Sequence, residues 1–187
     1  KVEGETSQYK LEGLKYGKTY KVVEKASNYE EVTFYLNVEA TGSDVTAAID
    51  STKGTAGVWS NESGWKLTNQ IKKTDLTLTK TYDGNPTNRV NEKDVAVFFI
   101  KENGASDATS KEVTLNDGKY VFTGLESGKT YTVTETAPAG FKPVEFKITV
   151  TEKANGAAVA AIEGYKANQD GSYTVNNEIR TISLTFD

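Results

Sequence analysis

A lysine, a glutamate and an asparagine lie at sequence positions where strand alternation turns a side chain into an apolar core. Alternate residues of a β-strand share a face, so a polar side chain points the same way as the apolar residues two and four positions before it. Three alternating segments end in this way, with Lys80 after Leu76 and Leu78, Glu135 after Tyr131 and Val133, and Asn177 after Tyr173 and Val175. Because isolated charges are costly to bury, we expect these three groups to lie together and satisfy one another.

One reaction suits this trio, namely an autocatalytic amide bond between Lys80 and Asn177. Burial favours the neutral amine, which can attack the side-chain carbonyl carbon of Asn177 while ammonia leaves. Glu135 would be the proton shuttle, and its acid form can hydrogen-bond the developing oxyanion. Two simpler interpretations remain open, a buried Lys80–Glu135 ion pair that Asn177 hydrogen-bonds, and a bulge that leaves Lys80 in solvent.

Asn176 is the rival acceptor for such a bond, because it is adjacent to Asn177 on the same expected strand. Its parity places it with Thr174, on the face that points away from the core. Asn177 is therefore the expected acceptor.

The composition excludes most other chemistry. The 187 residues include no Cys, His or Met, which removes disulfides, thiol nucleophiles, Ser-His pairs, zinc sites built on thiolate or imidazole, and haem ligation. We expect no cofactor and no metal. The net charge of -4 provides no basic field for nucleic acid, and no apolar stretch is long enough to cross a membrane. Only carboxylate chemistry would remain for an enzyme with turnover, and parity places no second acid beside Glu135.

An internal repeat sets the architecture. Residues 9–24 align with 120–135 at a constant offset of 111, and eight positions from Gly13 to Glu24 recur unchanged. Flanking segments continue the match at offsets of 112 and 108 residues. A period of this length is the size of a small β domain, so we expect two tandem, homologous units.

The strand signals predict an all-β fold. Period-2 alternation is strong in six segments of the second unit, and Gly with Asn or Asp marks the turns between them. The expected strands are 76–80, 95–100, 120–122, 131–135, 144–150 and 173–177. A weak helical pattern covers 154–161, so 154–162 is expected to be either a short helix or a small-residue strand.

The two units are unequal. We expect residues 73–180 to be a complete sandwich domain and 1–72 to be a domain that lacks its first strands. Residues 181–187 would be a tail or the start of a following strand, because Ser183–Asp187 resembles Asp75–Thr79. Both ends therefore look cut from a longer protein. Without its first strands, the first unit would expose a sheet edge and be unstable and prone to strand addition from another chain.

The second unit resembles a known family, the Cna B-type domains of Gram-positive surface adhesins and pilins. The resemblance rests on the segment from Tyr131 to Phe141, whose sequence Tyr-Thr-Val-Thr-Glu-Thr-Ala-Pro-Ala-Gly-Phe is similar to the family's E-box. It implies an immunoglobulin-like (prealbumin-like) β-sandwich with an intramolecular isopeptide bond. It also implies the same three roles, with Lys80 on the first strand, Glu135 as the E-box acid and Asn177 on the last strand.

The first unit keeps only part of this pattern. Glu24 and Asn69 stand at the matching places, but no residue here supplies the lysine. Its E-box is reduced to Glu24-Lys-Ala-Ser-Asn-Tyr29, without the Thr and the Pro. We therefore expect an incomplete equivalent of the site that forms no bond from this chain alone.

These features predict a structural stalk segment of an extracellular, cell-wall-anchored adhesin or pilin, whose partners are the neighbouring domains of its own parent. The alternative is an adhesin module that binds a host matrix protein or a glycan, for which Trp59 is the candidate contact and Trp65 is expected in the core. The loop 83–94 carries acids and amides that could hold calcium, but a solvated turn is favoured because Arg89 and Lys93 interrupt it.

Overall fold

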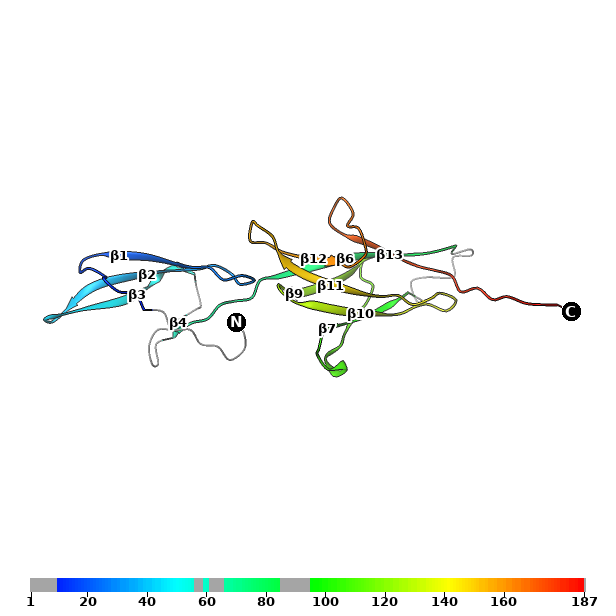
Figure 1. The fold of residues 1–187 in the computed structure, drawn as a ribbon, viewed down its shortest axis with the longest axis horizontal. Helices are drawn as coiled ribbons and strands as arrows, with labels where there is room; N and C mark the ends of the chain where they lie inside the picture. The colour runs from blue at the N-terminus through cyan, green and yellow to red at the C-terminus, as the bar shows by residue number, and fades with distance from the viewer. Residues whose placement is uncertain (1–9, 56–58, 61–65, 85–94, 187) are drawn as a thin grey trace. The chain divides into compact units, whose positions relative to one another are not determined.

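The computed structural model describes residues 10–55, 59–60, 66–84 and 95–186 of the chain. The chain divides into two compact units, unit 1 from Lys1 to Ile71 and unit 2 from Lys72 to Asp187 (Figure 1). The described residues of both units form β-strands, and the described part contains a single short 3-10 helix and no α-helix. The all-β prediction is confirmed.

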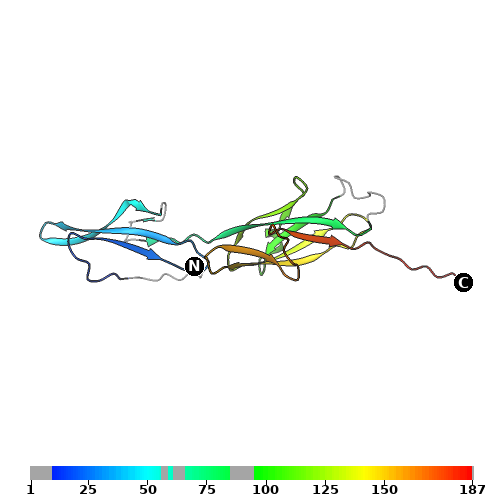
Figure 2. The same ribbon diagram turned by 90° about the horizontal axis from the view of Figure 1, so that it is seen from above.

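Unit 2 is a β-sandwich of two sheets (Figures 1 and 2). One sheet has five strands in the order β12-β11-β10-β7-β8, and the other has three in the order β13-β6-β9. The strands of unit 2 are β6 (Lys73–Tyr82), β7 (Val97–Glu102), β8 (Lys111–Val113), β9 (Tyr120–Glu126), β10 (Thr130–Thr136), β11 (Glu145–Glu152), β12 (Ala158–Ile162) and β13 (Tyr173–Asn177). Six of them match the segments that alternation predicts, although β7 and β11 begin two residues and one residue later than expected.

The core of unit 2 lies between the two sheets, where strands such as β9, β11 and β13 bury alternate residues. Its centre is aromatic. The Phe98 ring meets the Tyr120 ring edge-on, with centroids 4.8 Å apart, and the Phe122 and Phe146 rings surround it at 6.0 Å. Such edge-to-face pairs stabilise a core beyond the area they bury.

The first and last strands of unit 2 are parallel neighbours. β6 and β13 pair with Leu78 opposite Tyr173, Lys80 opposite Val175 and Tyr82 opposite Asn177. A parallel pair requires a long connection, and here the rest of the sandwich supplies it. This pairing brings residues almost a hundred positions apart in the sequence to the same end of one sheet.

Unit 1 contains a three-stranded antiparallel sheet of β1 (Thr19–Glu24), β2 (Val32–Thr41) and β3 (Asp44–Gly54). A short pair of β4 (Trp59–Ser60) and β5 (Lys66–Leu67) follows. The alignment makes β1, β2 and β5 the counterparts of β10, β11 and β13, and β3 pairs with β2 as β12 pairs with β11. No strand in the described part of unit 1 corresponds to β6, β7 or β8.

The sequence repeat is matched by repeated backbone contacts. An isolated antiparallel bridge joins Tyr29 to Ile71 in unit 1 and Phe141 to Ile179 in unit 2. In the same way, the amide of Gly17 donates to the carbonyl of Val38, and the amide of its counterpart Gly128 donates to that of Val150, both at 2.9 Å. The tyrosine hydroxyls of Tyr20 and Tyr131 each accept from a backbone amide five residues earlier, again at 2.9 Å.

Two local features differ from the sequence expectations. The helical option for residues 154–161 is wrong, because 158–162 form β12, which pairs with β11 through Ala160 opposite Val150. Alternation also missed β8 and the 3-10 helix at Asp107–Thr109 that precedes it, since both are only three residues long. Asn or Asp with Gly was expected to mark the turns, and at the turn of residues 116–118 Asp117 and Gly118 both have positive φ, as a tight hairpin requires.

Candidate functional site: a buried lysine, glutamate and asparagine

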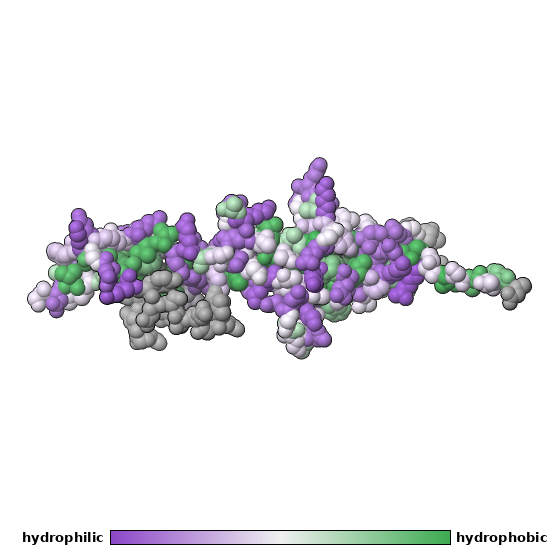
Figure 3. Space-filling model, in the orientation of Figure 1, coloured by the Kyte–Doolittle hydropathy of each residue, from purple (hydrophilic) through white to green (hydrophobic). Residues whose placement is uncertain are grey.

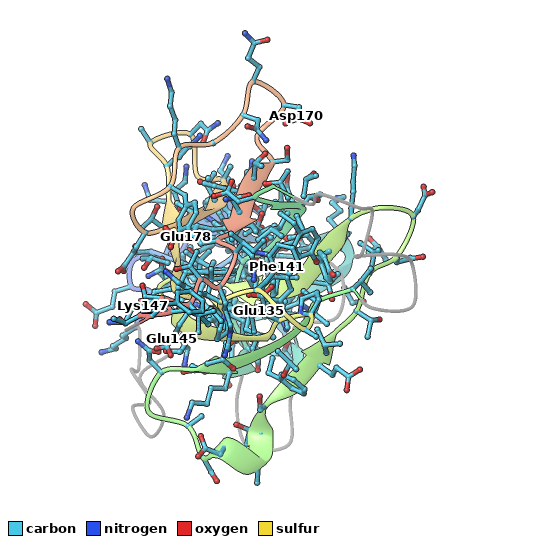
Figure 4. All side chains as sticks on the ribbon, turned by 90° about the vertical axis from the view of Figure 1, so that its right-hand side faces the viewer. Glu135, Phe141, Glu145, Lys147, Asp170 and Glu178 are labelled. Atoms are coloured by element: carbon cyan, nitrogen blue, oxygen red, sulfur yellow. The ribbon has the colours of Figure 1, made fainter. Side chains whose placement is uncertain are left out.

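The three predicted side chains lie together in the core of unit 2 and come from three different strands. Lys80 comes from β6 and Asn177 from β13 in one sheet, and Glu135 comes from β10 in the facing sheet. Only 3% of the Lys80 side chain and none of the Glu135 side chain is exposed, and Asn177 is fully buried. In Figure 4, Glu135 and Phe141 lie within the packed side chains, whereas Glu145, Lys147 and Asp170 lie outside them.

The Glu135 carboxylate joins the other two groups. Its Oε1 lies 3.4 Å from the Lys80 Nζ, and its Oε2 accepts a hydrogen bond of 2.8 Å from the Asn177 Nδ2. The backbone amide of Val144 donates to the same Oε2 at 2.8 Å. One carboxylate therefore contacts both the amine and the amide, with a different oxygen facing each.

The amide of Asn177 has a defined orientation. Its Nδ2 also donates to the backbone carbonyl of Lys142 at 2.7 Å, so both of the amide's donors are used. Exchanging the amide's oxygen and nitrogen would place an oxygen against two acceptors. The Oδ1 of Asn177, the Nζ of Lys80 and the Oε1 of Glu135 are all buried without a hydrogen-bond partner.

The surroundings of Lys80 are apolar. Its Nζ lies 5.8 Å from the centroids of both the Tyr82 and the Phe98 rings. Burial lowers the pKa of the Lys80 amine from its ordinary value of 10.5, while the charge of Glu135 acts in the opposite direction. Burial is the larger effect, so the site favours the neutral, nucleophilic amine.

Contacts with Phe141 and Ala96 hold the Tyr82 ring beside Lys80. The Tyr82 ring packs edge-on against the ring of Phe141, with centroids 5.1 Å apart. Its hydroxyl accepts from the amide of Ala96, and the carbonyl of Ala96 accepts from the hydroxyl of Tyr120 at 2.6 Å. Sequence reasoning missed Tyr82, although it shares the parity of Lys80 on β6. The backbone groups of residues 142 and 144 leave no signal in the sequence.

Asn176 points away from the site, as parity predicts. It is exposed, and its Oδ1 accepts a hydrogen bond of 3.0 Å from the Thr81 hydroxyl on the neighbouring strand. This arrangement leaves Asn177 as the asparagine of β13 that faces Glu135.

Unit 1 contains two of the three groups of this site, a glutamate and an asparagine. The Asn69 Nδ2 donates to the Glu24 Oε1 at 2.9 Å, which repeats the contact between Asn177 and Glu135. The other oxygen of Glu24 is buried without a hydrogen-bond partner. Among the described residues, none of the ion pairs includes Glu24.

The remaining candidates lie largely outside the described residues. Only the first two residues of the loop 83–94 are described, and Trp65 is not described at all. Trp59 belongs to β4, and its contact with a glycan stays a prediction. Within the described ranges no group of three or more acids could hold a metal ion, and none of the helices there is long and apolar enough for a membrane span.

Comparison with known proteins gives distant structural similarity alone. No family model and no curated protein matches the sequence. A C-terminal fragment of the pilus adhesin SpaC from Lactobacillus rhamnosus GG is similar to this chain with a TM-score of 0.46 and 16% identity, over 85% of this chain and 74% of the fragment. A longer structure of SpaC in an open conformation gives the same score and identity over 84% of this chain and 24% of that one. At this distance the similarity assigns no function.

Proposed function

We propose that unit 2 is a self-cross-linking stalk domain of a Gram-positive surface adhesin or pilin, in which Lys80 and Asn177 form an isopeptide bond. One observation carries the proposal, namely that the two oxygens of the buried Glu135 face the amine and the amide separately, at 3.4 Å and 2.8 Å. An ion pair that Asn177 only hydrogen-bonds is the competing interpretation, and the mass measurement described below separates the two. The resemblance of residues 131–141 to the E-box of Cna B-type domains supports the same assignment.

The reaction follows from the positions of the atoms. Transfer of a proton from the Lys80 Nζ to the Glu135 carboxylate leaves an amine with a free electron pair. This amine attacks the Cγ of Asn177, and the amide oxygen takes up the negative charge. Glu135 then gives this proton to the Nδ2, which lies within hydrogen-bonding distance of its carboxylate, and the carbon–nitrogen bond breaks. The second proton of the amine passes to Glu135, so the products are one neutral amide bond, one ammonia and a protonated Glu135, whose proton can leave with the ammonia as ammonium.

Burial serves the reaction in two ways. It keeps the amine neutral, and it removes the water that would compete for the carbonyl carbon or screen the developing charge. The carbonyl of Lys142 and the amide of Val144 hold the Asn177 amide and the Glu135 carboxylate in place before the reaction starts. No cofactor and no metal takes part in this scheme, and each chain reacts once.

The bond would join the two strands through which a pulling force enters and leaves unit 2. β6 and β13 are the first and last strands of unit 2, and the bond joins them near the end at which both finish. A force applied to the two ends of the unit would pass along β6 to Lys80 and leave directly through Asn177. The strands between them would carry no load. A surface protein without cysteine would gain in this way a cross-link that reducing conditions do not open.

The intact mass of the denatured chain tests the proposal. We expect the wild-type mass to fall short of the sequence mass by one ammonia, and the Lys80→Ala and Glu135→Ala variants to have their full sequence masses. Asn176→Ala is the matched control, because it removes the adjacent but exposed asparagine and should keep the deficit. A wild-type mass equal to the sequence sum would overturn the proposal and leave the three residues as a buried polar cluster.

A further inference from the structure

Tyr82, the last residue of β6, neighbours every part of the proposed site. It follows Lys80 by two positions and shares its face of the strand, and in the pairing with β13 it lies opposite Asn177. Its ring packs edge-on against Phe141, which comes six residues after Glu135 in the sequence. No step of the proposed reaction yet uses Tyr82.

Among the described residues, two rings lie close to the Lys80 amine. The Nζ is 5.8 Å from the centroid of the Tyr82 ring and 5.8 Å from that of Phe98. Phe98 is fully buried in the centre of the core, whereas Tyr82 is partly exposed. Figure 3 shows hydrophilic side chains over much of the surface of unit 2, where water has ready access. The Tyr82 ring therefore faces both the amine and the solvent.

A single buried residue, Ala96, anchors the Tyr82 hydroxyl. The amide of Ala96 donates to this hydroxyl at 3.2 Å, and the carbonyl of Ala96 accepts from the hydroxyl of Tyr120 at 2.6 Å. Ala96 and Tyr120 are both fully buried. Burial raises the pKa of both tyrosine hydroxyls, so they remain neutral hydrogen-bonding groups at neutral pH. Phe141 packs against the ring and Ala96 holds its hydroxyl, so the ring has a fixed position beside the amine.

We propose that Tyr82 is a positioning residue for the cross-linking reaction, whose anchored ring keeps water from the Lys80 amine and holds the amine against Glu135. The inference rests on the proposed function, because it assigns a role in that reaction. The nucleophile is the neutral amine, which dry surroundings favour. An amine held 3.4 Å from its proton acceptor also reacts faster than one that moves freely.

The ring also has an effect of the opposite sign. The face of an aromatic ring attracts an ammonium ion, but only within about 6 Å of the centroid, and the Lys80 Nζ at 5.8 Å is close to that limit. Among the described residues, Glu135 on β10 is the one charged group that faces the amine. Exclusion of water is therefore the larger effect of the ring, and its loss should raise the pKa of Lys80 toward the ordinary 10.5.

The rate of cross-linking at several pH values tests the proposal in the full 187-residue chain. Chains from cell-free synthesis are transferred to buffers of different pH, and the intact mass after denaturation gives the fraction that has lost ammonia at each time. At neutral pH we expect Tyr82→Ala to react about tenfold more slowly than the wild type, because a pKa rise of about one unit leaves about a tenth of the neutral amine. The difference should shrink as the pH rises. Tyr82→Phe retains the ring and should keep the wild-type pH profile.

Tyr131→Ala is the matched control. Tyr131 is also partly exposed, and its hydroxyl also accepts from a backbone amide, that of Glu126 at 2.9 Å. It lies on β10 four residues before Glu135, a distance of about 13 Å along the strand. This variant should react at the wild-type rate at every pH. Circular dichroism shows whether each variant is folded, and Tyr82→Leu, which keeps an apolar side chain without a ring, is used where Tyr82→Ala is not.

Three results would overturn the proposal. Equal slowing in Tyr82→Ala and Tyr131→Ala would mean that both act through stability alone. A Tyr82→Ala profile that is unchanged, or that moves to lower pH, would mean that the ring does not keep the amine dry. A wild type that never loses ammonia would overturn the proposed function together with this inference, whereas the first two results would leave the proposed function standing.

A second measurement does not depend on the reaction. In Glu135→Gln, which cannot cross-link, the lowered pKa of Lys80 makes unit 2 more stable as the pH rises toward 10.5. Adding Tyr82→Ala should flatten this rise in the urea midpoint, because the pKa of Lys80 then lies closer to its value in the unfolded chain. Adding Tyr131→Ala should leave the rise unchanged. An equal rise in the two double variants would refute the role of the Tyr82 ring.

Discussion

Removing the acceptor Asn177 should lower the stability of unit 2 by far more than its contacts explain. In Asn177→Ala no bond forms, so Lys80 and Glu135 keep each other as an ion pair and no buried charge lacks a partner. The Nδ2 of Asn177 leaves as ammonia in the reaction, so in the cross-linked chain a single amide N–H at most replaces its two hydrogen bonds. That hydrogen bond and the space that the side chain fills are each worth about 1 kcal/mol, so contacts account for about 2 kcal/mol.

The cross-link adds a larger contribution. The bond closes a loop of 98 residues, from Lys80 to Asn177. In the entropic model a loop of about 100 residues stabilises the fold by about 4.7 kcal/mol, because it restricts the unfolded chain. Asn177→Ala should therefore lower the free energy of unfolding of unit 2 by about 7 kcal/mol in total.

A double-mutant cycle with Lys80→Met separates the two contributions. Lys80→Met already prevents the bond, so Asn177→Ala should cost only about 2–3 kcal/mol in that background. The interaction energy of the cycle should then be about 4–5 kcal/mol. The assay is urea unfolding followed by far-UV circular dichroism, with tryptophan fluorescence as a separate signal for unit 1, which holds both tryptophans. An interaction energy below about 1 kcal/mol would refute the reasoning, since neighbours without a covalent bond can produce that much.

Three further changes test the description of the two units. In Glu135→Gln, which cannot cross-link, burial keeps the pKa of Lys80 in the folded chain below its ordinary 10.5. Between these two pKa values the unfolded chain binds one proton more than the folded chain. The urea midpoint of unit 2 should then rise with pH from that lowered pKa up to 10.5, and a flat profile would contradict the burial of Lys80. Gly54→Ala places a Cβ against the backbone carbonyl of Thr33 at a φ of +104°, and should destabilise unit 1 by about 1 kcal/mol or more, seen as an earlier tryptophan transition with unit 2 unchanged. Tyr120→Phe removes the hydroxyl that donates to a buried carbonyl and should cost unit 2 about 1–3 kcal/mol by urea unfolding, whereas a neutral result would deny that hydrogen bond.

Alternation was sufficient to predict where the three site residues point. Lys80, Glu135 and Asn177 lie at or within two residues of the end of strands whose apolar residues fix the facing of every second position. The internal repeat likewise predicted the paired contact of Glu24 with Asn69, because homologous strands keep the same register.

Other features depend on contacts that a sequence does not record. The carbonyl of Lys142 and the amide of Val144 act through the backbone, so no residue type marks them. β12 was ambiguous because its alanines suit a helix as well as a strand, and only its pairing with β11 decides between the two. The orientation of the Asn177 amide depends on acceptors from two different segments of the chain.

The branch point of the cross-link tests the central claim most directly. Trypsin does not cleave after an acylated lysine, so digestion of the denatured wild type should give a branched peptide of residues 74–89 joined to residues 167–180. Its mass should be the sum of the two peptides less one ammonia, and fragmentation should place the branch on Asn177 and not on Asn176. Cleavage after Lys80, together with an unmodified peptide 167–180, would contradict the account.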